Sequence, residues 1–179
     1  KRYYTGRGPL EAASLGVKLR KNDIAFRCNL VTIKDGKMES FTAHHVKTTE
    51  ARRIFKILNK ELGTRDIRFY PGLSYRNLLI MKDDRRGTMG AIKTIPPHDI
   101  TNKEIHNYLP RGKGSELLLK LMNESEVLLH DMKTKATLIW PWGQGKAPQL
   151  PSFRNKFGKR AAVITAVHLL KGLGKTLGM

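Results

Sequence analysis

Alternating and helical patterns of apolar residues predict two similar units in succession, and the first unit begins with a β-hairpin. Residues 23–34 are rich in β-branched and apolar side chains, the turn dipeptide Asp35-Gly36 follows directly, and an extended pattern resumes over residues 38–43. Apolar residues then recur at helical spacing over residues 48–63. The pattern predicts a hairpin followed by a helix whose apolar face packs on the sheet.

The second unit repeats this order of elements. Extended patterns over residues 67–70 and 77–81 predict two strands, and apolar residues at helical spacing from Ser115 onward predict an amphipathic helix. Between them, the capping-box spacing of residues 101–104 predicts a short helix that ends near Pro110. Two strand-strand-helix units in succession place two helices on one face of a mainly antiparallel sheet, which is an α+β arrangement.

The C-terminal part follows a different pattern. Residues 136–140 form a candidate strand, and so do residues 160–164, whose nearly continuous apolar run leads directly into a helical pattern over residues 166–173. A strand that enters a helix at once is typical of a parallel α/β sheet covered on both faces. We therefore expect a middle α+β unit whose flanks belong to an α/β layer.

Composition adds a strong positive charge. The 179 residues include 34 Lys and Arg against 15 Asp and Glu, a net charge of +19, and none of the acidic residues follows Asp131. Such a charge attracts polyanions, so a nucleic-acid-binding module is one interpretation, although no block of like charges forms a basic arm. An anionic ligand, an acidic partner, or an acidic region of the same protein that is absent here would also balance the charge.

The remaining composition restricts the setting of the protein and the chemistry of this chain. Cys28 is the single cysteine and sits in an apolar run, so we expect a buried, inert thiol and a reducing, cytoplasmic setting. No run of about 18 apolar residues predicts a membrane span. The sequence has no histidine pair at helical metal-ligand spacing, no P-loop and no nucleophile elbow, so we expect this chain to hold no metal by itself.

Several polar residues suit the recognition of phosphate or carboxylate. Arg27 and Asn29 alternate with apolar residues in the first strand and can point into one cleft. Arg76 begins a strand, where its guanidinium can hold an oxyanion with two hydrogen bonds. Residues 140–146, WPWGQGK, join two aromatic rings to a Gly-flanked turn that ends in Lys. Taken singly, each has a simpler explanation. Arg27 could form an internal ion pair, Arg76 could be a solvated charge at a strand end, and the two tryptophans could be ordinary core residues.

Six longer motifs follow one another along the chain. They are YYTGRGPLEAASLGV at residues 3–17, DIAFRCNLVT at 23–32, FYPGLSYRNLL at 69–79, PPHDI at 96–100, IWPWGQGKAPQLPSF at 139–153 and AAVITAVHLLKGLGKTLGM at 161–179. In this order they resemble the archaeal-type cofactor-independent phosphoglycerate mutases, which are metalloenzymes of the alkaline phosphatase superfamily.

The resemblance implies an isomerase of glycolysis and gluconeogenesis that interconverts 3-phosphoglycerate and 2-phosphoglycerate through a phosphorylated serine with two divalent metals, commonly manganese. It also implies three segments: an edge of the phosphatase-like base domain at residues 1–22, a substrate-recognition insert at 23–138, and a return to the base at 139–179. In the family, the nucleophile and the metal ligands stand in segments that this chain lacks. We therefore expect the chain alone to be inactive, and the complete protein to be far nearer neutrality.

Eight residues are expected to bind the phosphoglycerate by their place in these motifs. Arg27, Arg76 and Lys146 would hold phosphate and carboxylate groups, and His98 and Asp99 would bind glycerate hydroxyl groups. Two alternatives stay open: a nucleic-acid-binding module, and a phosphomutase of the same superfamily that acts on another sugar phosphate. The eight residues are Arg27, Asn29, Tyr75, Arg76, His98, Asp99, Gln144 and Lys146.

Overall fold

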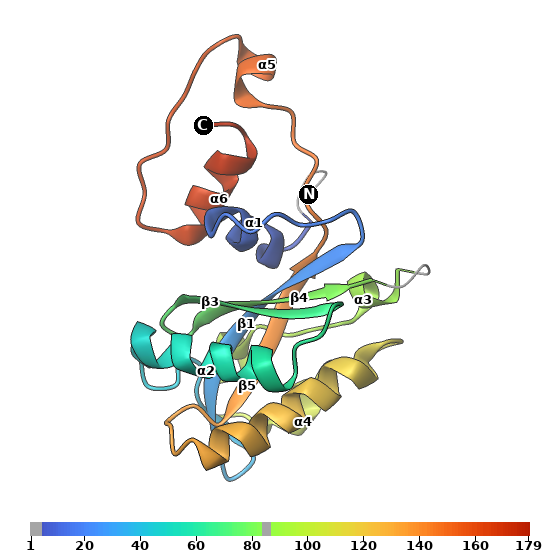
Figure 1. Ribbon diagram of the computed structural model, residues 1–179, viewed down its shortest axis with the longest axis vertical. Helices are drawn as coiled ribbons and strands as arrows, with labels where there is room; N and C mark the ends of the chain where they lie inside the picture. The colour runs from blue at the N-terminus through green and yellow to red at the C-terminus, as the bar shows by residue number, and fades with distance from the viewer. Residues whose placement is uncertain (1–4, 84–86) are drawn as a thin grey trace.

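The elements of the chain alternate between strands of one sheet and helices that cover it (Figure 1). The computed structural model describes residues 5–83 and 87–179. In chain order the elements are α1 (Arg7–Ser14), β1 (Asp23–Lys34), β2 (Lys37–Ser40), α2 (Thr48–Glu61), β3 (Ile67–Leu73), β4 (Arg76–Lys82), α3 (Thr88–Ala91), the 3-10 turns η1 (Pro97–Ile100) and η2 (Ile105–Tyr108), α4 (Ser115–Asp131), β5 (Leu138–Gly145), α5 (Phe153–Phe157) and α6 (His168–Thr176).

Strand β1 organises the five-stranded sheet. It pairs with β2, β4 and β5, and β4 pairs in turn with β3. These four pairings are all antiparallel within the part of the chain that the structure describes. The predicted mixture of helices with a mainly antiparallel sheet is therefore confirmed.

The two faces of the sheet pack against different helices. Phe26 and Cys28 of β1 enter the main hydrophobic core, which α2 and α4 complete, as Figure 1 shows below the sheet. Ala25 points the other way and packs with Ala12 of α1. Burial raises the pKa of the Cys28 thiol, which agrees with the expected inert cysteine.

Helix α1 lies between β1 on one side and α6 on the other, and glycines make both contacts close. A Cβ atom on Gly8 would stand 2.2 Å from the carbonyl oxygen of Ala25 in β1. On the other side, a Cβ atom on Gly172 of α6 would stand 1.7 Å from the carbonyl oxygen of Leu10. Both distances are far below a van der Waals contact, so only glycine allows α1 to lie at this depth.

The predicted elements of the middle unit are largely confirmed. The hairpin forms as β1 and β2, and the two long amphipathic patterns form α2 and α4. The short helix expected to end near Pro110 forms only in part, as the 3-10 turn η2, and the capping-box residues 101–104 are not helical. The backbone of this segment instead bonds the edge of β2, because Asn102 N donates to Met38 O and Met38 N donates to Lys103 O. Helical structure is confined to η1 and η2 on either side.

The strand predicted at residues 160–164 is wrong. These residues form no strand, and Ile164 is fully exposed. An apolar, β-branched run needs a partner strand or a covering layer to become a strand, and the described residues provide neither here. Helix α1, in contrast, has no counterpart among the predicted elements.

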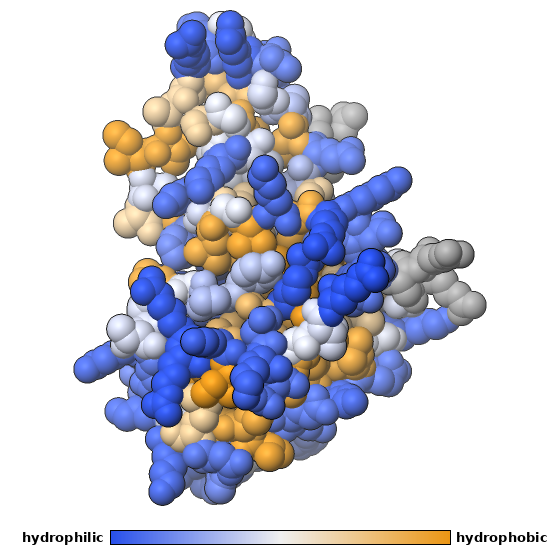
Figure 2. Space-filling view, in the orientation of Figure 1, coloured by the Kyte–Doolittle hydropathy of each residue, from blue (hydrophilic) through white to orange (hydrophobic). Residues whose placement is uncertain are grey.

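The described residues that follow β5 add no member to the main core. Strand β5 begins at Leu138, one residue before the third segment was expected to begin at residue 139, and the three segment boundaries stay predictions. Beyond it, α6 packs on α1, and Figure 2 shows apolar residues reaching the surface in the upper part that carries these helices. Among the described residues, no helix is long and apolar enough to cross a membrane.

Replacing Gly8 with Ala tests the close contact between α1 and β1. We expect Gly8→Ala to lower the free energy of unfolding by about 1–3 kcal/mol, because the new methyl group meets backbone atoms that have no room to move. Gly90→Ala in α3 is the matched control, since its Cβ would stand at an ordinary 3.6 Å from the Ile24 side chain. Urea unfolding of both variants measures the difference. Equal unfolding midpoints would contradict the close packing of α1.

Candidate functional site

Arg27 is a charged residue inside the sheet, and α1 provides its counter-charge. The Arg27 side chain is 4% exposed, and its Nη1 donates to Oε1 of Glu11, which is equally buried. The same oxygen lies 2.8 Å from Nε of Arg7, one helical turn earlier. Burial lowers the pKa of Arg27, and the charge of Glu11 opposes that shift. One carboxylate therefore serves two guanidinium groups.

Asn29 fixes the orientation of its neighbours. Its Oδ1 accepts hydrogen bonds from Nε of Arg27 and from Nε1 of Trp142, both at 3.1 Å. Its Nδ2 donates to the carbonyl oxygen of Phe41 at 3.0 Å. Both the oxygen and the nitrogen of the Asn29 side-chain amide are thus hydrogen-bonded. The Arg27 guanidinium is held by Glu11 on one side and by Asn29 on the other.

The strand register explains why these residues meet. Arg27 lies opposite Trp142 of β5, and Asn29 lies opposite Arg76 of β4. Side chains on directly opposite residues of antiparallel strands are within contact distance. Residues from three strands therefore gather beside α1.

Two aromatic rings beside α1 each contact two guanidinium groups, and three arginines take part. The Trp142 ring centroid lies 5.4 Å from Cζ of Arg7 and 5.5 Å from Cζ of Arg27. The Tyr75 ring centroid lies 6.0 Å from Cζ of Arg27 and 4.9 Å from Cζ of Arg76. Nη2 of Arg76 also donates to the Tyr75 hydroxyl at 3.0 Å. These contacts favour positive charge over the ring faces and restrict the guanidinium positions.

Histidine and phenylalanine rings continue the aromatic surface. The His98 ring of η1 meets Trp142 edge to face at 5.4 Å and Phe41 at 6.0 Å, and Phe41 meets Tyr75 at 6.3 Å. Asp99 stands next to His98, with 3.6 Å between Oδ1 and His98 Nε2. The structure thus brings together Arg27, Asn29, Tyr75, Arg76 and His98 among the expected residues, with Asp99 at the edge.

Gln144 and Lys146 have other partners. The Gln144 amide donates to Ile92 O and accepts from Oγ1 of Thr94 at 2.7 Å, so it braces β5 against the segment before η1. Lys146 is exposed and its Nζ lies 3.4 Å from Oδ2 of buried Asp83. Gln144 lines an open groove of about 510 Å³ that adjoins the cluster at Trp142. The binding roles expected for both residues stay predictions.

A metal site is not formed by the residues that the structure describes. Among residues 5–83 and 87–179, no group of three or more His, Cys, Asp or Glu side chains is placed to hold a metal ion. These residues therefore do not fit the metals that the family resemblance implies, and we derive no step through a metal.

Sequence reasoning misses two members of the cluster, Arg7 and Glu11. Their i, i+4 spacing is the available signal, because it places both on one face of a helix. Gly6, Gly8 and Pro9 obscure that helix, although proline is well tolerated in a first helical turn.

Comparisons with known proteins agree with the sequence motifs. A family model described as 2,3-bisphosphoglycerate-independent phosphoglycerate mutase matches residues 1–134. The protein of that name from Methanosarcina barkeri is 47% identical over 188 residues, which cover 99% of this chain and 46% of the relative. The one from Methanosarcina acetivorans is 45% identical with the same coverage. The chain thus spans about half the length of the curated relatives it matches.

Solved structures share the fold at lower identity. A protein of Pyrococcus horikoshii superposes with a TM-score of 0.67 at 21% identity, over 98% of this chain and 42% of that chain. The cofactor-independent phosphoglycerate mutase of Thermoplasma acidophilum superposes with a TM-score of 0.62 at 23% identity, over 99% and 51%.

Replacing Glu11 with Gln tests the buried pair. The variant leaves the Arg27 charge buried without a full counter-charge, so we expect a loss of about 3–5 kcal/mol in the free energy of unfolding. Urea unfolding measures the loss, and Glu116→Gln on the exposed face of α4 is the matched control, expected to change stability by less than about 1 kcal/mol. The double variant Glu11→Gln/Arg27→Met should recover part of the loss. A Glu11→Gln protein as stable as the wild type would rule out the pair.

Proposed function

Because the chain belongs to the family of 2,3-bisphosphoglycerate-independent phosphoglycerate mutases, we propose that the whole protein interconverts 3-phosphoglycerate and 2-phosphoglycerate. We further propose that the cluster beside α1 holds this substrate. The observation that carries the proposal is the grouping of three arginines with one carboxylate: Arg7 and Arg27 share Glu11, and Arg76 joins them through the Tyr75 ring. Such an excess of guanidinium charge suits a ligand that bears both a phosphate and a carboxylate.

The three arginines contribute in different ways. Arg27 is buried and paired, so it supplies positive charge from the floor of the site. Arg7 is partly exposed and shares Glu11 with it. Arg76 is half-buried, and among the described residues no carboxylate lies within ion-pair distance of its guanidinium. Arg76 is therefore the group best placed to form a bidentate pair with an anionic group of the substrate.

Firm positioning is what the proposed reaction needs. The phosphoryl group has to return to the other hydroxyl of the same glycerate, and holding the reactants in one geometry raises their effective concentration by orders of magnitude. The rigid contacts of Asn29, Tyr75 and Trp142 support such a role, because they fix the guanidinium groups before a ligand arrives. His98 and Asp99 at the rim are available to bind hydroxyl groups of the glycerate.

The serine nucleophile, the divalent metals and their ligands are part of the proposal for the whole protein. We assign none of these roles to the described residues. We accordingly expect residues 1–179 alone to show no turnover in a coupled assay with 3-phosphoglycerate.

Activity of the full-length protein tests the substrate. With manganese present, we expect it to convert 3-phosphoglycerate to 2-phosphoglycerate, measured by a coupled enolase assay, and to act poorly on pentose phosphates. If the protein turned over a pentose phosphate and did not turn over phosphoglycerate, it would be a different phosphomutase, and the proposal would be refuted.

Variants at Arg76 test the site. Loss of charge-assisted hydrogen bonds in Arg76→Ala should lower kcat/KM by about 10–100-fold. Arg76→Lys should recover only part of this, because an ammonium group cannot form the bidentate pair. Arg53→Ala on the exposed face of α2 is the control and should keep the wild-type rate. Wild-type kcat/KM in Arg76→Ala would remove Arg76 from the site.

A further inference from the structure

The turn between β2 and α2 has an unusual backbone. Ala43, His44 and His45 are consecutive and all have positive φ angles, of 47°, 52° and 56°. L-residues visit the left-handed region mostly as single residues, because Cβ crowds the following carbonyl group. Three such residues in a row persist only where the surroundings enforce them.

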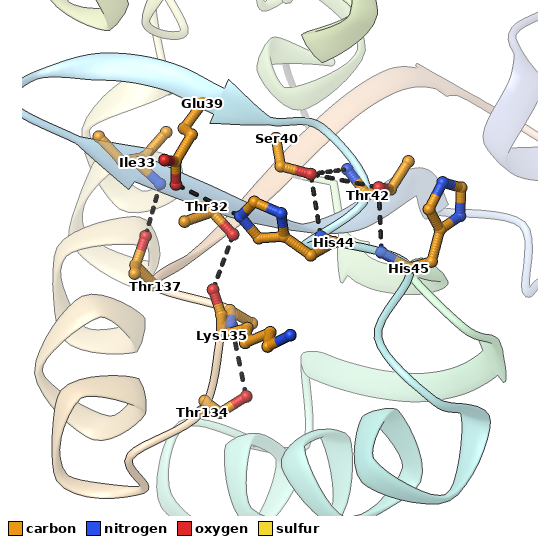
Figure 3. Close-up of polar contacts among 11 residues, drawn as sticks. Thr32, Ile33, Glu39, Ser40, Thr42, His44, His45, Thr134, Lys135 and Thr137 are labelled. Carbon is orange, nitrogen blue, oxygen red and sulfur yellow. Dashed lines mark hydrogen bonds and ion pairs between the residues drawn. The ribbon is translucent and has the colours of Figure 1, made fainter.

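Hydroxyl groups hold this turn, and Figure 3 shows those of Ser40 and Thr42. Oγ of Ser40 accepts from the backbone N–H of His44 at 2.9 Å, and Oγ1 of Thr42 accepts from the N–H of His45 at 3.2 Å. From the neighbouring turn, Oγ of Ser74 donates to the carbonyl oxygen of Val46 at 2.6 Å. The segment is therefore locked to the turn that precedes Tyr75.

This backbone sends the two histidine side chains in different directions, as Figure 3 shows. The His44 ring turns back to β2, where its Nε2 lies 3.3 Å from Oε2 of Glu39. The His45 ring instead meets the ring of Tyr75 edge to face, with 6.3 Å between centroids. Within residues 5–83 and 87–179, neither ring nitrogen of His45 has a hydrogen-bond partner.

His45 thereby joins the aromatic surface of the site at the end opposite Trp142. Rings contact one another in the order His45, Tyr75, Phe41, His98, Trp142. Tyr75, which contacts His45, also contacts Arg76. The Arg76 guanidinium lies over the Tyr75 ring and donates a hydrogen bond to its hydroxyl group. An exposed imidazole, whose ring nitrogens have no partner among the described residues, therefore contacts the same tyrosine as Arg76, the arginine whose charge is least compensated.

We propose that His45 is a further substrate-binding residue, whose imidazole N–H donates a hydrogen bond to the anionic group held by Arg76. The inference rests on the proposed function of the site. The left-handed turn serves to aim this donor, since an ordinary turn would not direct the two adjacent histidines to Glu39 and to Tyr75. A purely structural role, in which the His45 ring only packs on Tyr75, is the alternative.

Binding of 3-phosphoglycerate to the full-length protein, measured by calorimetry, separates the two roles. His45→Asn keeps a residue that tolerates positive φ but is too short to reach the ligand, and His45→Phe keeps the ring contact without a donor. If His45 donates a hydrogen bond, both variants should bind about tenfold more weakly or worse. His44→Asn is the matched control in the same turn and should bind as the wild type does.

Other outcomes overturn the inference. Wild-type affinity in His45→Phe, with a loss in His45→Asn, would show that only ring packing matters. Wild-type affinity in both variants would remove His45 from the site while the proposed function stood. A wild-type protein that binds no phosphoglycerate would overturn the proposed function together with this inference. If one variant fails to fold by circular dichroism, the other still decides between binding and no role.

Discussion

A guanidinium in the middle of a strand that is buried on both faces needs a counter-charge, because an unpaired buried charge costs several kcal/mol. Arg27 is that residue, and Glu11 is the counter-charge. Glu11 reaches it only if α1 lies at backbone distance from β1, which Gly8 permits, and Gly172 lets α6 cover α1 equally closely. The same carboxylate then positions Arg7. One ion pair thus connects the helix layer, the sheet and the candidate site.

The site concentrates a property of the whole chain. The net charge of +19 is spread along the sequence. Positive side chains bind an anionic ligand specifically only where they are held close together with few acidic partners. Surface pairs such as Lys120 with Glu124 are exposed and contribute little. Beside α1, by contrast, three arginines contact two aromatic rings, and a single carboxylate pairs with two of them, Arg7 and Arg27. This arrangement suits a small ligand with two anionic groups better than a long polyanion, which would need a broad surface of flexible cations.

Local patterns predict the parts of the fold that depend on local interactions. The hairpin and helices α2 and α4 follow from turn residues and apolar periodicity, whereas residues 160–164 show that an apolar run forms no strand without a neighbour.

The residue types of the candidate site can be predicted from the sequence, but the way in which these residues come together cannot. Alternation along β1 points to Arg27 and Asn29, but their grouping with Trp142 and Arg76 depends on strand register, which arises from long-range pairing. Glu11 is missed because its helix begins among glycines and a proline.

Backbone strain is concentrated at the same place. Among the described residues, seven that are not glycine have positive φ, and four of these lie in the two turns that flank Tyr75, namely Ala43, His44, His45 and Ser74. Each costs about 1–2 kcal/mol relative to an ordinary conformation. Hydrogen bonds from Ser74 to Val46 and from Ser74 N to Thr48 Oγ1 tie the turns together, so neither can relax alone. A rim built this way resists collapse onto the half-buried Arg76. Strain that keeps a cationic group open before a ligand binds is what a preorganised binding site requires.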